Sequence, residues 1–416
     1  MRGTLALTRR HRDPTDAEPL PSIRRHAVFG VLVLLGVALR VIVSLAYRPV
    51  LLYPDSLAYL YNATHLGPRI QRPTGYPLLL RPLLAAHDLT VVAVVQHVFG
   101  LAIAVIIYAV ALRRGVRPWL AALATAPVLL DAYQLSAEHY VLSDAMFERM
   151  LAGAVAVLLW PRGRRSGRPA EPLGVGRCVV AALLLALSVW VRSTGLLLTV
   201  PALGYLLLRS DGRGLRLRRA GAFVVAVAAP LLGYAAWTQA TDGAFAINQF
   251  TGRLLYGRVA PFVDCGRMQV PPIERGLCPT LPRAQRHTTD EYTWASWSPA
   301  VIYSDRYGAR SDGILRDFAL RAIRNQPGDY LDSVAADLRH TFALTHTPRP
   351  ADVSEAYARF TDESPSPVAG SGPVLRRYGG GPARVNAGLA SFLGSYQRVG
   401  YLPGTLLLPL IALGPA

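Results

Sequence analysis

The sequence predicts an all-α membrane protein: a polytopic bundle of transmembrane helices with a large first external loop and a C-terminal extracytoplasmic segment of mixed, irregular structure. Two features of composition indicate this class. Of the 416 residues, 52% are hydrophobic and only 17% are charged, whereas soluble globular domains are about 25% charged. The third indication is the recurrence of apolar windows of about 20 residues, the length that crosses a bilayer as a helix. This composition argues against a soluble protein with a single core.

Seven apolar windows are each expected to form a transmembrane helix. They cover residues 27–46, 89–112, 119–137, 141–160, 177–193, 195–208 and 220–238. The first window follows a polar, basic stretch and is too long and too late for an ordinary cleaved signal peptide, so we expect a retained span. A further apolar run at 402–416 is too short to span comfortably. We expect it to begin another transmembrane helix of a longer protein, with a re-entrant or interfacial end as the alternative.

The distribution of arginine indicates the topology. The formal net charge is +18, which by itself would suggest an anionic partner. However, four arginine-rich segments between the windows carry +14 of it, and all of them fall on one side of the predicted bundle. That side is cytoplasmic by the positive-inside rule. These segments are the N-terminus, 113–118, 161–177 and 209–219. The bilayer is therefore the expected partner of the basic residues, and no nucleic acid is expected.

This topology predicts a protein of the cell membrane whose chain has four parts. Residues 1–26 are predicted to be a basic cytoplasmic tail. Residues 27–238 form the predicted transmembrane core, with the first external loop at 47–88. Residues 239–401 are predicted to be an extracytoplasmic domain, in which 314–343 forms two amphipathic helices broken at Gln326-Pro327-Gly328. Residues 402–416 begin the further helix.

Cysteine usage agrees with this sidedness. Cys265 and Cys278 both lie in the predicted extracytoplasmic domain, where an oxidising environment would allow a disulfide between them. Two free thiols are the alternative. Cys178 lies at the cytoplasmic start of a predicted span and is interpreted as a small apolar residue.

Charged groups near the external ends of spans are functional candidates, because charges at membrane depth are costly. In the first loop these are Asp55, followed by Tyr59, and Arg72, followed by Tyr76. Asp55 follows Pro54 and precedes a helical pattern, so the structural alternative is a cap or first-turn acid of an interfacial helix.

Three further external positions carry such groups. His139 and Asp144 precede or enter the fourth window, and Arg192 lies in the hairpin after the fifth. Their structural alternatives are a packed histidine, an ion-pair cluster of Asp144 with Glu148 and Arg149, and an arginine that reaches lipid headgroups. Asp131 is the weakest candidate and is interpreted as a helix cap.

Four segments on the predicted external side resemble, in their order along the chain, the polytopic GT-C glycosyltransferases. This superfamily includes the protein O-mannosyltransferases and the aminoarabinose transferases. The segments are Asp55 with Tyr59, PTGYPLLL at 73–80, HYVLSDAMF at 139–147, and VRSTGLLLTVP at 191–201. The second is similar to a P-x-G-Y-P stretch of such loops. The third is similar to an R-Y-x-L-x-D stretch in which His139 replaces the arginine. Where many relatives have two adjacent acids, this chain has Asp55-Ser56. The resemblance covers about residues 27–240.

The resemblance implies a sugar transfer, with inversion, from a polyprenyl-phosphate donor to an acceptor hydroxyl at the extracytoplasmic face. Asp55 would be the catalytic base, since a carboxylate can take the acceptor's proton. Arginine suits bidentate contacts with the departing phosphate, which implicates Arg192 first and Arg72 second. Substrate binding would further involve Asp144, Tyr59, Tyr76 and His139.

The expected partners are then the lipid-linked donor and a glycan, lipid or protein acceptor. No cofactor and no metal ligand is assigned, although a divalent cation stays open. The competing hypotheses are a transporter or flippase of a lipid-linked substrate and a non-catalytic membrane scaffold. A transporter would be expected to carry two related halves, and the sequence shows no such internal repeat.

Overall fold

The computed structural model describes residues 22–67, 72–161, 173–209, 212–248, 250–344, 357–362, 371–378 and 384–406. This part of the chain is mainly helical, and its strands form a single two-stranded sheet. Strand β1 (Tyr47–Arg48) pairs antiparallel with β2 (Arg384–Val385). The sheet therefore joins the end of the first helix to the C-terminal part of the chain.

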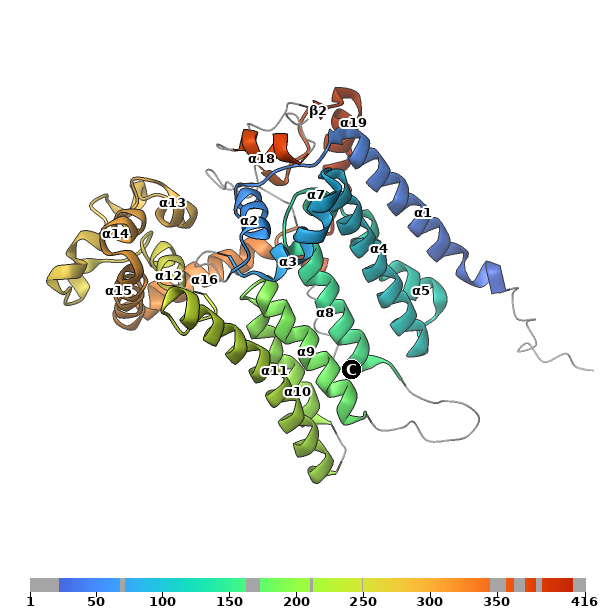
Figure 1. Ribbon diagram of the computed structural model, residues 1–416, viewed down its shortest axis with the longest axis horizontal. Helices are drawn as coiled ribbons and strands as arrows, with labels where there is room; N and C mark the ends of the chain where they lie inside the picture. Colours follow the sequence, from blue (N-terminus) through green and yellow to red (C-terminus); the bar gives the residue numbers. More distant parts are fainter. Residues whose placement is uncertain are drawn as a thin grey trace, which may run out of the picture.

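The N-terminal half is a helical bundle in which α8, α9, α10 and α11 lie side by side (Figure 1). Apolar side chains of these helices share one buried core, which includes Ala154, Ala181, Leu206 and Phe223. The helices are α1 (Ser22–Ala46), α2 (Pro54–Thr64), α3 (Gly75–Leu83), α4 (Thr90–Arg113), α5 (Pro118–Leu123), α6 (Ala126–Leu130), α7 (Ala132–His139), α8 (Asp144–Leu159), α9 (Val175–Val191), α10 (Gly195–Leu208) and α11 (Arg213–Asp242).

Within the described residues, three helices are long and apolar enough to cross a membrane, namely Arg24–Ala46 of α1, α4 and α11. A fourth span results if Pro118–Leu130 and Ala132–His139, which meet at a bend of 51°, are taken together. Helices α8, α9 and α10 have 16, 17 and 14 residues, fewer than the roughly 20 that cross a bilayer. The structure thus supports three or four of the seven predicted spans by length and composition.

The shorter helices have identifiable local causes. Residues 140–143 leave the helical path because Tyr140 forms a parallel bridge with Leu51, so α8 begins at Asp144 rather than at 141. Arg192 has an extended backbone and caps α9, which separates α9 from α10. An apolar window does not reveal such interruptions, because periodicity reports burial and not backbone pairing.

The bend in the third window is made by Asp131. Its Oδ1 atom accepts hydrogen bonds from the backbone N–H groups of Tyr133 and Gln134 at 2.8 and 3.2 Å, so Asp131 caps the N-terminus of α7. This confirms its interpretation as a helix cap. Its Oδ2 atom accepts from the N–H of Leu402 at 2.7 Å, which attaches the C-terminal segment to the bend.

Residues 250–341 form a second helical unit with its own core. Its helices are α12 (Thr251–Val259), α13 (Thr289–Trp294), α14 (Pro299–Tyr307), α15 (Ser311–Asn325) and α16 (Pro327–Thr341). Helices α12 and α15 pack so closely that a Cβ atom on Gly252 would lie 1.8 Å from the carbonyl oxygen of Asp312. The predicted helix break is confirmed, since α15 ends before Gln326 and α16 begins at Pro327.

A disulfide joins Cys265 to Cys278 in this unit. The loop is also held by Gln326, which accepts a hydrogen bond from the N–H of Asp264 at 2.7 Å and donates one to its carbonyl at 3.0 Å. Both sulfur atoms pack against the core that contains Tyr256 and Phe318. Cys178 is a buried free cysteine.

Replacing both Cys265 and Cys278 by serine should destabilise this unit by about 2–3 kcal/mol, because the open loop gains entropy in the unfolded state. The change is measured as a lower melting temperature of the purified protein in detergent under oxidising conditions. Treatment of the wild type with a reductant should give the same shift. Equal melting temperatures for the two proteins would contradict the prediction.

The C-terminal described segments return to the bundle. They contain α18 (Ser371–Arg377) and α19 (Ala387–Gln397), and α19 packs against α1 and α7. The N–H of Ala132 donates to the carbonyl of Gly400 at 2.7 Å. The predicted tail up to residue 21, most of the loop at 161–177 and residues 407–416 of the predicted further helix lie outside the described residues.

Candidate functional site

The position of Asp55 follows from the start of α2. Pro54 occupies the first turn, where its missing N–H has no cost. Ser56 fixes this turn, since its Oγ atom accepts from the N–H of Tyr53 and donates to the carbonyl of Val141, both at 2.9 Å. Asp55 is thus a first-turn acid of α2, as the structural alternative to a catalytic role predicts. An acid in the first turn of a helix interacts favourably with the positive end of the helix dipole.

Arg72 pairs with Asp55 across the first loop. Its NH2 atom lies 2.5 Å from Oδ1 of Asp55, and the two side chains are 23% and 28% exposed. Burial lowers the pKa of Arg72, but the charge and hydrogen bond of Asp55 outweigh this and raise it above its ordinary value. Arg72 also stacks over Trp294 at 5.5 Å from the ring centre. A permanently charged guanidinium therefore joins the first loop to α13.

A second ion pair joins the two helix ends nearest to this loop. Asp144 is the first residue of α8, and its Oδ2 atom lies 2.5 Å from NH1 of Arg192 at the end of α9. Both side chains are about one-third exposed, at 32% and 39%. Glu148 is hydrogen-bonded to Gln134 at 2.8 Å. Asp144 therefore pairs with a neighbouring helix, as the alternative of an ion pair that holds spans together expects, but its partner is Arg192 and not Arg149.

Two cavities meet at Asp55. One, which we call the Arg192 cavity, has a volume of about 300 Å³ and brings Asp55, Asp144 and Arg192 together. The other, the Trp294 cavity, has a volume of about 550 Å³ and contains Asp55 and Arg72. Tyr53 and Asp55 line both cavities. The four charged residues selected from the sequence thus lie around one pair of adjoining cavities.

The Arg192 cavity has aromatic walls and an uncompensated hydroxyl. Tyr140 and Tyr357 each lie edge-on to Tyr53, at 6.3 and 5.1 Å between ring centres, and all three line the cavity. Ser136 also lines it, and its buried Oγ atom has no hydrogen-bond partner among the described residues. A buried hydroxyl without a partner is costly.

The Trp294 cavity presents two acids and an indole from α13. Glu291 closes a capping box with Thr288, and the backbone hydrogen bond of Thr288 lowers the pKa of Glu291. Asp290 lies beside it on the same wall. Trp294 is 41% exposed and has guanidinium groups of Arg72 and Arg253 over its ring. The exposed part of the indole and the two carboxylates together are suited to a ligand with several hydroxyls.

Three of the predicted binding residues lie in the protein interior and line neither cavity. Tyr59 and Tyr76 are buried and pack edge to face at 5.0 Å, because they point from α2 and α3 into the core between them. Burial raises the pKa of Tyr59. His139 is fully buried, and its ring contacts the carbonyl of Tyr47 at 2.7 Å and the ring of His97 at 3.2 Å. These three residues therefore pack in the interior behind the cavity walls.

The structure also shows a buried charged network that the sequence did not indicate. Arg40 of α1 makes two hydrogen bonds of 2.8 Å to the carboxylate of Glu138 at the end of α7. His97 of α4 lies 2.9 Å from the same carboxylate, and all three side chains are almost inaccessible. A charge within an apolar window is a signal that could have found Arg40. The network fixes α7, which carries Ser136 to the Arg192 cavity.

No group of three or more His, Cys, Asp or Glu side chains within the described residues could hold a metal ion. A ring nitrogen of His97 already contacts the carboxylate of Glu138, and one of His139 contacts the backbone carbonyl of Tyr47. The chain matches no protein-family model, no curated protein and no solved structure. Its function is therefore inferred from the chemistry of the two cavities.

Proposed function

We propose that this protein is a membrane glycosyltransferase of the GT-C type. It transfers a sugar, with inversion, from a polyprenyl-phosphate donor to an acceptor hydroxyl. The observation that carries this proposal is the position of Asp55 in the wall shared by two cavities, with the guanidinium of Arg192 in one of them. A carboxylate between two binding spaces can serve a reaction that joins two substrates.

In this mechanism the donor phosphate lies beside Arg192 and the acceptor enters through the Trp294 cavity. Asp55 accepts the proton of the acceptor hydroxyl while the hydroxyl oxygen attacks the anomeric carbon of the donor sugar. The new glycosidic bond forms as the bond between that carbon and the phosphate oxygen breaks. The lipid phosphate leaves with the bonding electron pair, and Arg192 stabilises its charge. Arg72 keeps the carboxylate of Asp55 oriented until the acceptor binds.

The arrangement of arginines supports a reaction at one membrane face. Arg114 donates to the carbonyl of Leu159 at 2.7 Å, and Arg177 donates to that of Val157 at 2.9 Å. Both therefore lie at the C-terminal end of α8, whereas Asp144 lies at its N-terminal end. A helix of 16 residues is about 24 Å long. With the arginine-rich end in the cytoplasm, the cavities open on the extracytoplasmic side.

Removing the gene should abolish one sugar substituent of the cell envelope, which mass spectrometry of the envelope glycans can detect. Expression of the wild-type protein should restore it and would identify both the sugar and the acceptor. A transporter or scaffold would also lose the substituent on deletion. Variants of Asp55 and Arg192 distinguish these functions, because only a transferase needs these two side chains for chemistry.

Replacing Arg192 by Gln should lower kcat of the transfer about 10- to 100-fold, because a charge-assisted contact with the leaving phosphate is lost. Arg192→Lys should retain part of the activity, since it keeps the charge without the bidentate geometry. Arg324→Gln, which removes an exposed arginine of α15, is the matched control. Unchanged kcat in Arg192→Gln would remove this residue from the mechanism.

A further inference from the structure

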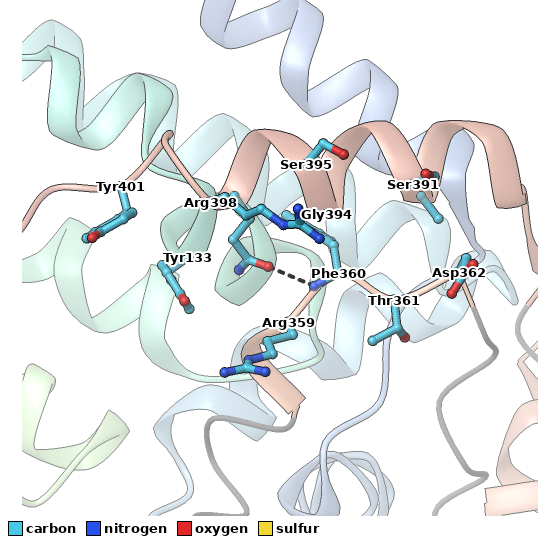
Figure 2. A pocket seen from close by; sticks show the side chains of 12 residues that line it. Tyr133, Arg359, Phe360, Thr361, Asp362, Ser391, Gly394, Ser395, Arg398 and Tyr401 are labelled. Atoms are coloured by element: carbon cyan, nitrogen blue, oxygen red, sulfur yellow. Dashed lines mark hydrogen bonds between the residues drawn. The ribbon is translucent and has the colours of Figure 1, made fainter. Parts of the chain in front are cut away.

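A third cavity lies between the segment 359–362 and helix α19. It has a volume of about 610 Å³, and we call it the Arg398 cavity. Arg398, at the end of α19, and Arg359, on the facing segment, enter it from its two sides (Figure 2). Ser391 and Ser395 add hydroxyl groups from α19. The lining is therefore polar and positively charged.

The wall opposite α19 is held by specific contacts. The N–H of Phe360 donates to the Oε1 atom of Gln397 at 2.9 Å, the hydrogen bond drawn as a dashed line at Phe360 in Figure 2. The Nε2 atom of Gln397 donates to the carbonyl of Ala358 at 2.9 Å. Phe360 is buried and stacks on Tyr47 at 5.6 Å. Tyr47 in turn donates to the carbonyl of Thr361 at 2.8 Å. The cavity is thus built from a segment anchored both to α19 and to Tyr47 of β1.

The charges in this cavity do not compensate one another. Neither Arg359 nor Arg398 forms an ion pair or a side-chain hydrogen bond within the part of the chain that the structure describes. Asp362 is the one carboxylate among the lining residues, and it forms no ion pair with either guanidinium there. Two arginines on facing walls suit an anion that accepts hydrogen bonds from both, above all a phosphate.

The surroundings of the cavity indicate where that phosphate comes from. Helix α19 packs beside the C-terminal end of α1, one of the helices long enough to cross a membrane (Figure 1). At this end α1 exposes Val41 and Leu45, at 51% and 42%. Next to the cavity, Phe392 and Val399 are 48% and 80% exposed. Exposed apolar side chains next to paired arginines mark the level at which acyl chains meet headgroups.

We propose that the Arg398 cavity binds the headgroup of an anionic glycerophospholipid, with the phosphate between Arg359 and Arg398. The hydroxyl groups of Ser391 and Ser395 fit a hydroxylated headgroup such as glycerol. A headgroup with a cationic amine would bring a third positive charge to the two guanidinium groups. Tyr133 lines both this cavity and the Arg192 cavity, so a bound lipid stabilises one wall of the proposed active site. The site itself does not depend on the proposed activity.

The test is native mass spectrometry of the full-length protein in detergent with added phosphatidylglycerol or phosphatidylcholine. We expect the wild type to bind phosphatidylglycerol about tenfold or more tightly than phosphatidylcholine, since each charge-assisted contact contributes about this factor. Arg359→Gln/Arg398→Gln should abolish the preference, and each single variant should reduce it. Arg324→Gln should keep it.

Three results would overturn the proposal. The first is equal binding of the two lipids by the wild type, a measurement that needs no variant. The second is an unchanged preference in a double variant that elutes and melts like the wild type. The third is displacement of phosphatidylglycerol by inorganic phosphate at similar concentration, which would assign the cavity to a free anion. Retained lipid preference in an inactive Asp55→Asn protein would support the site independently of the proposed function.

Discussion

Replacing Asp55 by Asn is expected to lower the rate of sugar transfer by about a hundredfold to ten-thousandfold, the range that a positioned general base contributes. The amide has nearly the same shape as the carboxylate but cannot accept the acceptor's proton. The rate is measured with membranes that contain the variant, the polyprenyl-phosphate donor and the acceptor identified from the envelope glycans. Complementation of the deletion strain with this variant should leave the sugar substituent absent.

This loss should occur in a folded protein. The ion pair of Asp55 and Arg72 is about one-quarter exposed, and pairs in contact with solvent contribute at most about 1 kcal/mol. The variant should therefore elute from size exclusion like the wild type and melt within a few degrees of it. Asp317→Asn is the matched control, since that carboxylate is 60% exposed and pairs with Arg316 at 3.7 Å on the surface of α15. Full transfer activity in Asp55→Asn would exclude the proposed mechanism.

The sequence predicted the features that depend on local patterns. Pro54 before an acid indicated a helix start, and the structure has α2 begin there with Asp55 in its first turn. Asp131 and the break at Gln326 were predicted as a cap and a helix end, and both are confirmed. Helix boundaries of this kind are encoded within a few residues, so they can be recognised without knowing the tertiary structure.

Features that depend on distant pairing were not predictable in this way. The window 141–160 looks like an uninterrupted span, but its first residues bridge to Leu51 instead of forming a helix. His139 has the polarity of a binding residue, yet His97 and the carbonyl of Tyr47 occupy its ring. Trp294 lies far along the chain from Asp55, and no local signal links it to the same cavity. Such pairings depend on how distant parts of the chain pack together, and local sequence patterns do not reveal them.

The buried pair of Arg40 and Glu138 leads to the largest expected effect on stability. Replacing Glu138 by Ala should destabilise the fold by about 3–5 kcal/mol, because it leaves the guanidinium of Arg40 buried without a counter-charge. Arg40 is 3% exposed and donates further bonds of 3.1 and 3.0 Å to the carbonyls of Gly36 and Leu129. These carbonyls supply partial charge only and cannot replace a carboxylate. The change is measured as a lower midpoint of unfolding in a titration of mixed micelles with a denaturing detergent.

A double variant distinguishes the buried charge from a loss of packing. Arg40→Met/Glu138→Leu removes both charges and keeps most of the volume, so it should recover much of the stability that either single change loses. There is little spare space, since a Cβ atom on Gly100 would lie 1.9 Å from Oε1 of Glu138. The truncation Glu138→Ala therefore also leaves a void, and the fraction recovered by the double variant measures the electrostatic part. If Glu138→Ala unfolds at the wild-type midpoint, Arg40 is not held as a buried charge and α7 must be fixed by its other contacts.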